Sequence, residues 1–191
     1  MNKLPLTLDC ESTQAVHLMV RYQQGDTEAG NAICEMYGQR VLRFLWARLP
    51  REDAYDVSQE VWLRIHTDRR MLYNPDRGPV YPWLVWEARK HLNDWLRKRK
   101  KVVLDIDEVP EFEVSTKDDD EGYRVLEAIE TQAELWAALG KLEPMYREVI
   151  ILRYFDQLSR QDCAMALDVP QGTYDRRHHV ALNKLRAILG M

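Results

Sequence analysis

Residues 159–185 read SRQDCAMALDVPQGTYDRRHHVALNKL, and this stretch carries the strongest fold signal in the chain. Ser159 is suited to cap the N-terminus of a short helix. Asp168 occupies the turn that follows, where a positive φ is usual and where Asp is tolerated better than most residues. Ala164 is small enough for two helices to cross closely, and Tyr174 would anchor the second helix. This order of cap, small residue, turn residue and anchor predicts a helix-turn-helix. An αα-hairpin within a purely structural bundle has the same pattern.

The second helix of this pair carries basic and amide side chains. Such side chains on the second helix are what reading of the DNA major groove needs. The candidate duplex-reading residues are Gln171, Thr173, Arg176, Arg177, His178 and Lys184.

Two helix-rich blocks, residues 12–101 and 131–191, flank an acidic middle. Residues 105–130 hold eleven Asp and Glu against one Lys and one Arg. Because such a composition buries little apolar surface, residues 102–130 are predicted to form a flexible linker. Alternating strand patterns are absent. The sequence therefore predicts an all-α chain with two small helical domains, an N-terminal bundle and a C-terminal helix-turn-helix domain.

Cap residues and apolar spacing predict the individual helices. Asp26 suits an N-cap, Pro50 ends the helix that follows it, and Pro82 suits a first helical turn. Residues 73–79 have the composition of a loop. The predicted helices cover residues 27–49, 52–67, 82–101, 134–142, 145–155, 159–167 and 170–189.

The helix predicted over 82–101 has a core face and an opposite face that combines cations with aromatic rings. Its end, residues 97–101, reads RKRKK. Cations can track phosphates while flat rings stack on unpaired bases, so this face predicts binding of single-stranded nucleic acid. Two alternatives stay open: the tryptophans pack within their own domain, and the cations form a solvated helix end favoured by the macrodipole. The candidate residues are Trp83, Trp86, Lys90, Asn93, Arg97, Lys98 and Lys101.

The helix predicted over 52–67 carries an acidic stripe. Asp53, Asp56 and Glu60 lie close together on the helical wheel, away from the apolar arc. The helix dipole would explain Asp53 but not the continuation to Glu60. A face that binds a basic protein partner is the sharper hypothesis. Acid–base chemistry is the alternative, but no pocket or nucleophile motif accompanies these carboxylates.

Composition and motifs argue against several other classes of protein. The three cysteines, Cys10, Cys34 and Cys163, are widely spaced and suit free thiols in a reducing cytosol. No phosphate-binding loop, metal-ligand spacing or nucleophile motif occurs, so we expect no enzyme, no metal and no cofactor. We also expect no signal peptide, no membrane span and no membrane contact, which places the protein in the cytoplasm.

Four segments, in this order and at this spacing, resemble the extracytoplasmic-function (ECF) family of bacterial sigma factors over nearly the whole chain. RYQQGDTEAGNAICEMYGQRVLRFLWARL (21–49) looks like the first conserved helical region. DAYDVSQEVWLRIH (53–66) is similar to the segment that grips the polymerase clamp. PWLVWEARKHLNDWLRKRKK (82–101) is similar to the promoter-melting region. Residues 142–186 resemble the −35-reading domain, with its P-x-G-T signature at residues 170–173.

The resemblance implies a subunit that binds core RNA polymerase and both double- and single-stranded promoter DNA. The clamp of the largest polymerase subunit would be contacted by Asp53, Asp56, Gln59 and Glu60. A base pocket formed by residues 73–81 would add Asn74 and Arg77 to the −10-binding set named above. The last helix would lie in the −35 major groove near the polymerase flap, and the family usually has an anti-sigma partner.

One departure from the family pattern carries a prediction of its own. Asp175 stands where the family commonly has Lys, and its carboxylate would repel DNA phosphates. We therefore expect Asp175→Lys to strengthen binding to the −35 duplex.

Two other functions remain possible at this point. A helix-turn-helix regulator that binds duplex DNA without polymerase would show no affinity for the core enzyme. A sigma-like adaptor that only sequesters an anti-sigma partner would leave the basic helix without affinity for single-stranded DNA.

Overall fold

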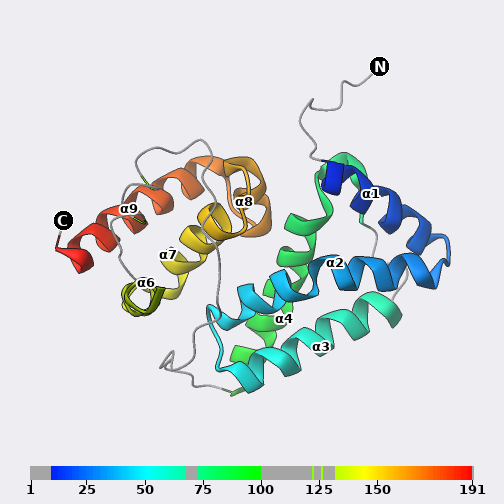
Figure 1. Cartoon of the computed structure of the whole chain (residues 1–191), viewed down its shortest axis with the longest axis horizontal. Coiled ribbons are helices and arrows are strands. Elements are labelled where there is room, and N and C mark those ends of the chain that lie inside the picture. Colours follow the sequence, from blue (N-terminus) through cyan, green and yellow to red (C-terminus); the bar gives the residue numbers. More distant parts are fainter. Residues whose placement is uncertain (1–9, 68–72, 100–121, 123–125, 127–131, 191) are drawn as a thin grey trace.

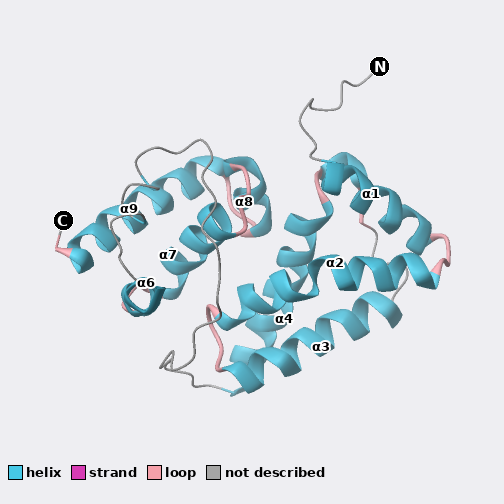
Figure 2. Cartoon of the chain, in the orientation of Figure 1, coloured by secondary structure: helices cyan, strands magenta, loops and turns pink. Residues whose placement is uncertain are grey.

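The structure, a computed structural model, describes residues 10–67, 73–99, 122, 126 and 132–190 (Figure 1). All regular elements of these residues are helices, which confirms the all-α class (Figure 2). The first group comprises α1 (Cys10–Gln23), α2 (Thr27–Trp46), α3 (Arg51–Thr67), the 3-10 helix η1 (Pro75–Arg77) and α4 (Val80–Arg99). The second group comprises α6 (Gln132–Gly140), α7 (Pro144–Ile150), the π-helical turn η2 (Ile151–Phe155), α8 (Arg160–Ala166) and α9 (Gln171–Leu189). Nearly all of the expected linker lies outside the described residues.

The N-terminus of α2 forms as its sequence predicts. The Asp26 carboxylate accepts a hydrogen bond from the Ala29 backbone N–H at 3.1 Å and pairs with the Arg21 guanidinium. These partners favour the charged carboxylate, and they lower the pKa of Asp26 below its ordinary value. Helix α1, from which Arg21 reaches this cap, was not predicted; it packs against α2 and α4.

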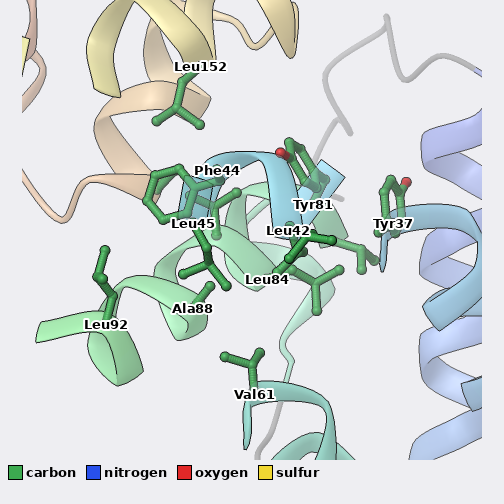
Figure 3. Packing of buried hydrophobic residues seen from close by; sticks show 14 of the residues in the cluster. Tyr37, Leu42, Phe44, Leu45, Val61, Tyr81, Leu84, Ala88, Leu92 and Leu152 are labelled. Carbon is green, nitrogen blue, oxygen red and sulfur yellow. The ribbon is translucent and has the colours of Figure 1, made fainter. Parts of the chain in front are cut away.

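The core of the first group lies where α2, α3 and α4 meet (Figure 3). Phe44 and Leu45 of α2 are fully buried together with Val61 of α3 and Leu84 of α4. Truncation of a buried Phe in such a core typically costs about 3–5 kcal/mol. This packing fixes α3 and α4 side by side, so their outward faces have fixed positions.

The helix-turn-helix forms from α8 and α9, as predicted. The Ser159 hydroxyl caps α8 by accepting from the Asp162 backbone N–H at 3.1 Å. Asp168 adopts the expected positive φ, 52°, in the turn. Tyr174 and Ala164 are both buried where α9 crosses α8.

The single helix expected over 145–155 is interrupted. After α7 the chain widens into the π-helical turn η2, and the Asp156 N–H donates to the Ile151 carbonyl at 3.0 Å. Gln157 follows with a φ of 55°. Such π turns are commonly found at functional positions. Here the turn leads into Asp156, a carboxylate that is buried at the boundary between the two groups of helices.

The two groups pack against each other. Helix α8 lies along α4, and Leu152 of η2 points toward Phe44 and Leu45 of α2 (Figure 3). The Arg147 guanidinium donates to the Ala47 carbonyl across the boundary at 2.8 Å, and it also binds three carbonyls at the end of α6. The sequence carried no signal for this contact.

Candidate nucleic-acid interface

A cleft of about 360 Å³ opens at the N-terminal end of α4. Most of its wall comes from the loop before α4 and from the first turns of that helix. The remaining wall comes from the helix-turn-helix. The lining residues are Tyr73, Asn74, Arg77, Gly78, Pro79, Trp83, Trp86, Glu87, Met165 and Asp168.

The loop of the cleft is held in one shape by its own hydrogen bonds. The Asn74 side chain accepts from the Asp76 N–H at 2.9 Å, and the Tyr73 hydroxyl donates to the Gly78 carbonyl at 2.7 Å. Burial raises the pKa of Tyr73 to about 12, so this hydroxyl stays a neutral donor. Gly78 has a φ of 137°, a conformation that side chains rarely adopt. The exposed Arg77 side chain is thereby presented at the rim.

The two tryptophans of α4 do not form the exposed pair that the sequence predicted. Trp83 packs against the core and meets the Tyr73 ring edge-on, with centroids 5.7 Å apart. Trp86 is half-buried in the cleft wall, and the Lys90 ammonium lies 4.1 Å from its ring centroid. The alternative of packing within the domain therefore holds for Trp83, because the loop before α4 folds back over it. Trp86 keeps a cation above its ring.

The basic end of α4 points outward. Asn93 and Lys98 are exposed, and the Arg97 guanidinium pairs with Asp94 at 2.6 Å on an open surface. Exposed pairs of this kind contribute little stability, so Arg97 is able to exchange its partner for a phosphate. Lys101 lies outside the described residues.

Glu87 is a residue of the cleft that the sequence analysis missed. Its side chain is 4% exposed, and it pairs with Lys90 at 3.2 Å. The spacing of three residues between Glu87 and Lys90 was the available signal. This carboxylate fixes the Lys90 ammonium above Trp86.

The acidic stripe of α3 is confirmed as an outward face. Asp56, Gln59 and Glu60 are exposed, and Asp53 is partly exposed. Two apolar side chains that were not assigned to this face also reach solvent, Tyr55 at 40% and Leu63 at 63%. The spacing of Asp56, Glu60 and Leu63 at i, i+4 and i+7 could have revealed the second of these. A stripe that joins carboxylates to open apolar side chains is typical of a protein-binding face.

The candidate residues of α9 fall into different environments. Gln171 and Arg176 are exposed, whereas Thr173 and Arg177 are partly buried. The Lys184 ammonium pairs with Glu143 at 2.8 Å on the surface. Gln171 and Arg176, near the N-terminus of the helix, are therefore the most accessible of these candidates.

The prediction that His178 contacts DNA is wrong. The imidazole is only 6% exposed, and the Tyr154 hydroxyl and the His178 Nε2 atom lie 2.8 Å apart. The Tyr174 ring also stacks against the imidazole, with centroids 5.9 Å apart. His178 follows Tyr174 by one helical turn, so the same spacing that buries Tyr174 buries His178.

The described residues hold neither a cluster of metal ligands nor a membrane-spanning helix. No group of three potential metal ligands gathers there. Burial raises the pKa of the free Cys163 thiol to about 12, which keeps it unreactive. None of the described helices is long and apolar enough to cross a membrane.

The chain matches two models of one protein family. Residues 33–102 match Sigma-70 region 2, and residues 132–185 match Sigma-70 region 4. The ECF RNA polymerase sigma factor RpoE of Cereibacter sphaeroides is 29% identical over 188 residues, covering 95% of this chain and 98% of the relative. The ECF sigma factor SigM of Bacillus subtilis is 26% identical over 164 residues, covering 82% and 92%.

Solved structures show the same fold. CnrH, solved with the cytosolic domain of CnrY, aligns with a TM-score of 0.63 at 21% identity, covering 95% of this chain and 98% of CnrH. The sigma factor RpoE of Bartonella quintana, solved with the anti-sigma factor NepR, aligns with a TM-score of 0.61 at 22% identity, covering 84% and 96%.

A helical bundle matching region 2, followed by a helix-turn-helix matching region 4, defines a sigma factor of the sigma-70 class. Within that class the chain belongs to the ECF family. It is a transcription initiation factor that binds RNA polymerase and acts at promoters, and it is not an enzyme.

Proposed function

We propose that three surfaces divide the work of this sigma factor: the α3 stripe binds core polymerase, the cleft and the basic face of α4 bind the melted −10 element, and α9 reads the −35 duplex. The observation that carries the proposal is the separation of opposite charges on two neighbouring helices. Asp56 and Glu60 point outward from the α3 stripe, whereas the C-terminal part of α4 presents Lys90, Arg97 and Lys98, with Asp94 paired to Arg97. Charge of one sign on each face selects the partner of the opposite sign.

The α3 stripe suits a protein partner better than a nucleic acid. Its exposed carboxylates Asp56 and Glu60 repel phosphates and attract basic side chains, while Leu63 offers apolar area to bury. The partner assigned to Asp53, Asp56, Gln59 and Glu60 is the clamp of the largest polymerase subunit. The polymerase flap is the corresponding partner of the C-terminal domain.

The cleft has the chemistry of a site for an unstacked base. The Trp86 ring supplies a stacking surface, and Lys90 and Arg77 supply positive charge beside it. The Asn74 amide, exposed at the loop, is able to hydrogen-bond a base edge. Asn93, Arg97, Lys98 and Lys101 would track the phosphates that follow.

The N-terminal part of α9 is the proposed −35 reader. Recognition helices contact base edges mainly through their first turns. Gln171 and Arg176 are exposed there, and Thr173 and Arg177 lie beside them. Lys184, farther along α9, is suited to a backbone phosphate.

We further infer that the protein works in the cytoplasm and that an anti-sigma factor binds it there. Support comes from the two solved relatives above, of which one was solved with an anti-sigma factor. The acidic linker, whose path lies outside the described residues, is proposed to follow the RNA path of the polymerase.

The docking proposal is tested by measuring the affinity of the purified protein for core polymerase. Asp56→Ala combined with Glu60→Ala is expected to weaken binding by at least about tenfold, because two exposed charges of a docking face are lost. The matched control is Glu28→Ala combined with Glu35→Ala, which removes two exposed carboxylates from α2 instead. Equal affinities of the two double variants would contradict the proposal.

A further inference from the structure

We propose that Glu87 selects the kind of base that the cleft accepts: by holding the Lys90 ammonium in place, it gives the cleft a fixed hydrogen-bond donor that favours guanine or thymine over adenine or cytosine. Glu87 is thus a positioning residue, which acts through Lys90 and not by touching the base. Its role rests on the proposed function of the cleft, and it adds a base preference to that function.

Two ion pairs of α4 share the same spacing and differ in burial. Glu87 and Lys90 are three residues apart, and so are Asp94 and Arg97. The Asp94 side chain is 55% exposed, whereas the Glu87 side chain is 4% exposed. Water competes for both partners of the exposed pair, but it has little access to the Glu87 carboxylate. The Glu87 pair is therefore the one that keeps its cation in a defined position.

The buried Glu87 carboxylate depends on the Lys90 ammonium. Its two oxygens accept hydrogen bonds from that ammonium at 3.3 and 3.2 Å. A buried carboxylate that loses its cation is strongly unfavourable. His91, one turn farther along α4, offers no second cation, because burial and the Arg64 guanidinium lower the pKa of its imidazole. Glu87 therefore retains Lys90 as its partner.

The same contact fixes Lys90 beside the stacking surface. Its ammonium lies 4.1 Å from the centroid of the Trp86 ring, and its side chain is 45% exposed. A mobile lysine on an open helix face contacts phosphates without reading sequence. Lys90 is already ordered by a carboxylate and a ring, so little further entropy is lost when it bonds a base. A base that lies against Trp86 meets an ordered donor.

The loop side of the cleft offers donors as well. The Asn74 side-chain oxygen accepts from the Asp76 N–H, which leaves the amide NH₂ group for a ligand. The Tyr73 hydroxyl already donates to the Gly78 carbonyl. Arg77, exposed at the rim, has only donors. A base held by this loop and by Lys90 therefore has to supply acceptors.

The four bases differ in the group that they present to such a donor. Guanine and thymine carry a carbonyl oxygen, O6 or O4, where adenine and cytosine carry an amino group. An ammonium donates to the carbonyl oxygen, but it has no acceptor for the amino group. A fixed ammonium therefore separates the two classes of base by roughly tenfold.

Asp168 is the carboxylate of the cleft wall that opposes this preference. It is exposed and lies in the turn of the helix-turn-helix, so it belongs neither to α4 nor to the loop. Its oxygens would accept from the amino group of adenine or cytosine. Lys90 and Asp168 thus predict opposite base preferences, and a measurement of base selectivity separates them.

Base selectivity of the complex with core polymerase is the direct test. The complex is mixed with a pool of random single-stranded DNA, and the bound fraction is sequenced. One position of the bound motif should favour guanine and thymine by about tenfold over adenine and cytosine. Glu87→Gln keeps the shape of the side chain but releases Lys90. It should reduce the preference at that position to about twofold or less, because a mobile cation contacts phosphates instead.

Two controls accompany Glu87→Gln. Asp94→Asn neutralises the carboxylate of the exposed pair with the same spacing, and it should leave the base preference unchanged. Asp168→Asn should not weaken the preference. Circular dichroism of each variant establishes that it is folded.

Reversal of the pair is the sharper variant. Glu87→Lys combined with Lys90→Glu keeps an ion pair at this spacing and puts an acceptor in the place of the donor. The preference should then change to adenine and cytosine, which a merely structural role of Glu87 would not produce. If the reversed pair does not fold, Glu87→Gln and its controls decide.

Three results would overturn the role of Glu87. The first is a bound motif without a position that favours guanine and thymine, and the second is such a position that Glu87→Gln leaves unchanged. The third is a preference for adenine and cytosine that Asp168→Asn removes.

Trp86→Ala in the same complex separates this failure from failure of the cleft. If it weakens DNA binding while no base class is selected, the cleft still takes up a base and only the selection by Glu87 has failed. If Trp86→Ala binds DNA as tightly as the parent complex does, the proposed role of the cleft has failed as well.

Discussion

Helices α3 and α4 lie side by side in the first domain and both carry charge outward, yet their outward faces differ in how much of them is open. Asp56, Glu60 and Leu63 of α3 reach solvent along the helix. On α4 the basic C-terminal part is open, whereas the first turns meet the helix-turn-helix. The comparison shows that the charge on a helix face indicates the kind of partner, while access to that face depends on packing from distant parts of the chain.

Among changes to the first turns of α4, which meet the helix-turn-helix, Trp86→Ala is expected to have the largest effect on DNA affinity. The effect is expected in the polymerase-bound form. Loss of one base-stacking ring typically costs about 1–3 kcal/mol, so affinity for a single-stranded −10 oligonucleotide should fall about tenfold. Trp86 lies outside the core cluster, so the domain should remain stable. The measurement is fluorescence anisotropy with labelled DNA.

Trp86→Phe is the matched control, because it keeps an aromatic ring in the cleft. It should retain most of the affinity. If Trp86→Ala binds as well as Trp86→Phe does, the cleft does not take up a base, and the contrast between α3 and α4 loses its functional meaning.

A smaller effect is expected from Asp175→Lys on α9. Its carboxylate lies 3.9 Å from the Arg160 guanidinium on an open surface, so the change removes only a weak ion pair. The new cation should tighten binding to the −35 duplex by roughly threefold at low salt, and added salt should reduce the gain. Titration of duplex DNA at two salt concentrations measures both effects.

Asp175→Asn should give an intermediate affinity, because it removes the repulsion without adding a cation. Unchanged or weaker duplex binding by Asp175→Lys would contradict the account. It would mean that the open side of α9 near Arg176 does not face the DNA backbone.

Much of the fold was predictable because local signals determine it. Asp26 and Ser159 cap their helices as expected, and Asp168 adopts the positive φ that its place in the turn requires. The acidic stripe of α3 follows from helical spacing alone, since the apolar positions at Val57 and Val61 fix which side is buried.

The surroundings of individual side chains were less predictable, because they depend on residues far away in the sequence. His178 is polar and lies among basic residues, but Tyr154, 24 positions earlier, supplies its buried partner. Trp83 is covered by Tyr73 of the preceding loop. Asp156 finds Tyr81 across 75 positions. No periodicity within one helix reports such contacts.

The most direct test of the central claim is transcription by core polymerase and the purified protein from a fragment library of the source genome. Discrete start sites that share −10 and −35 motifs are expected, and they should be lost with Asp56→Ala plus Glu60→Ala. Specific transcripts should persist with the control pair Glu28→Ala plus Glu35→Ala. A folded protein, free of any co-purified inhibitor, that gives no specific transcripts and no polymerase binding would contradict the account and would favour a regulator or adaptor that acts without polymerase.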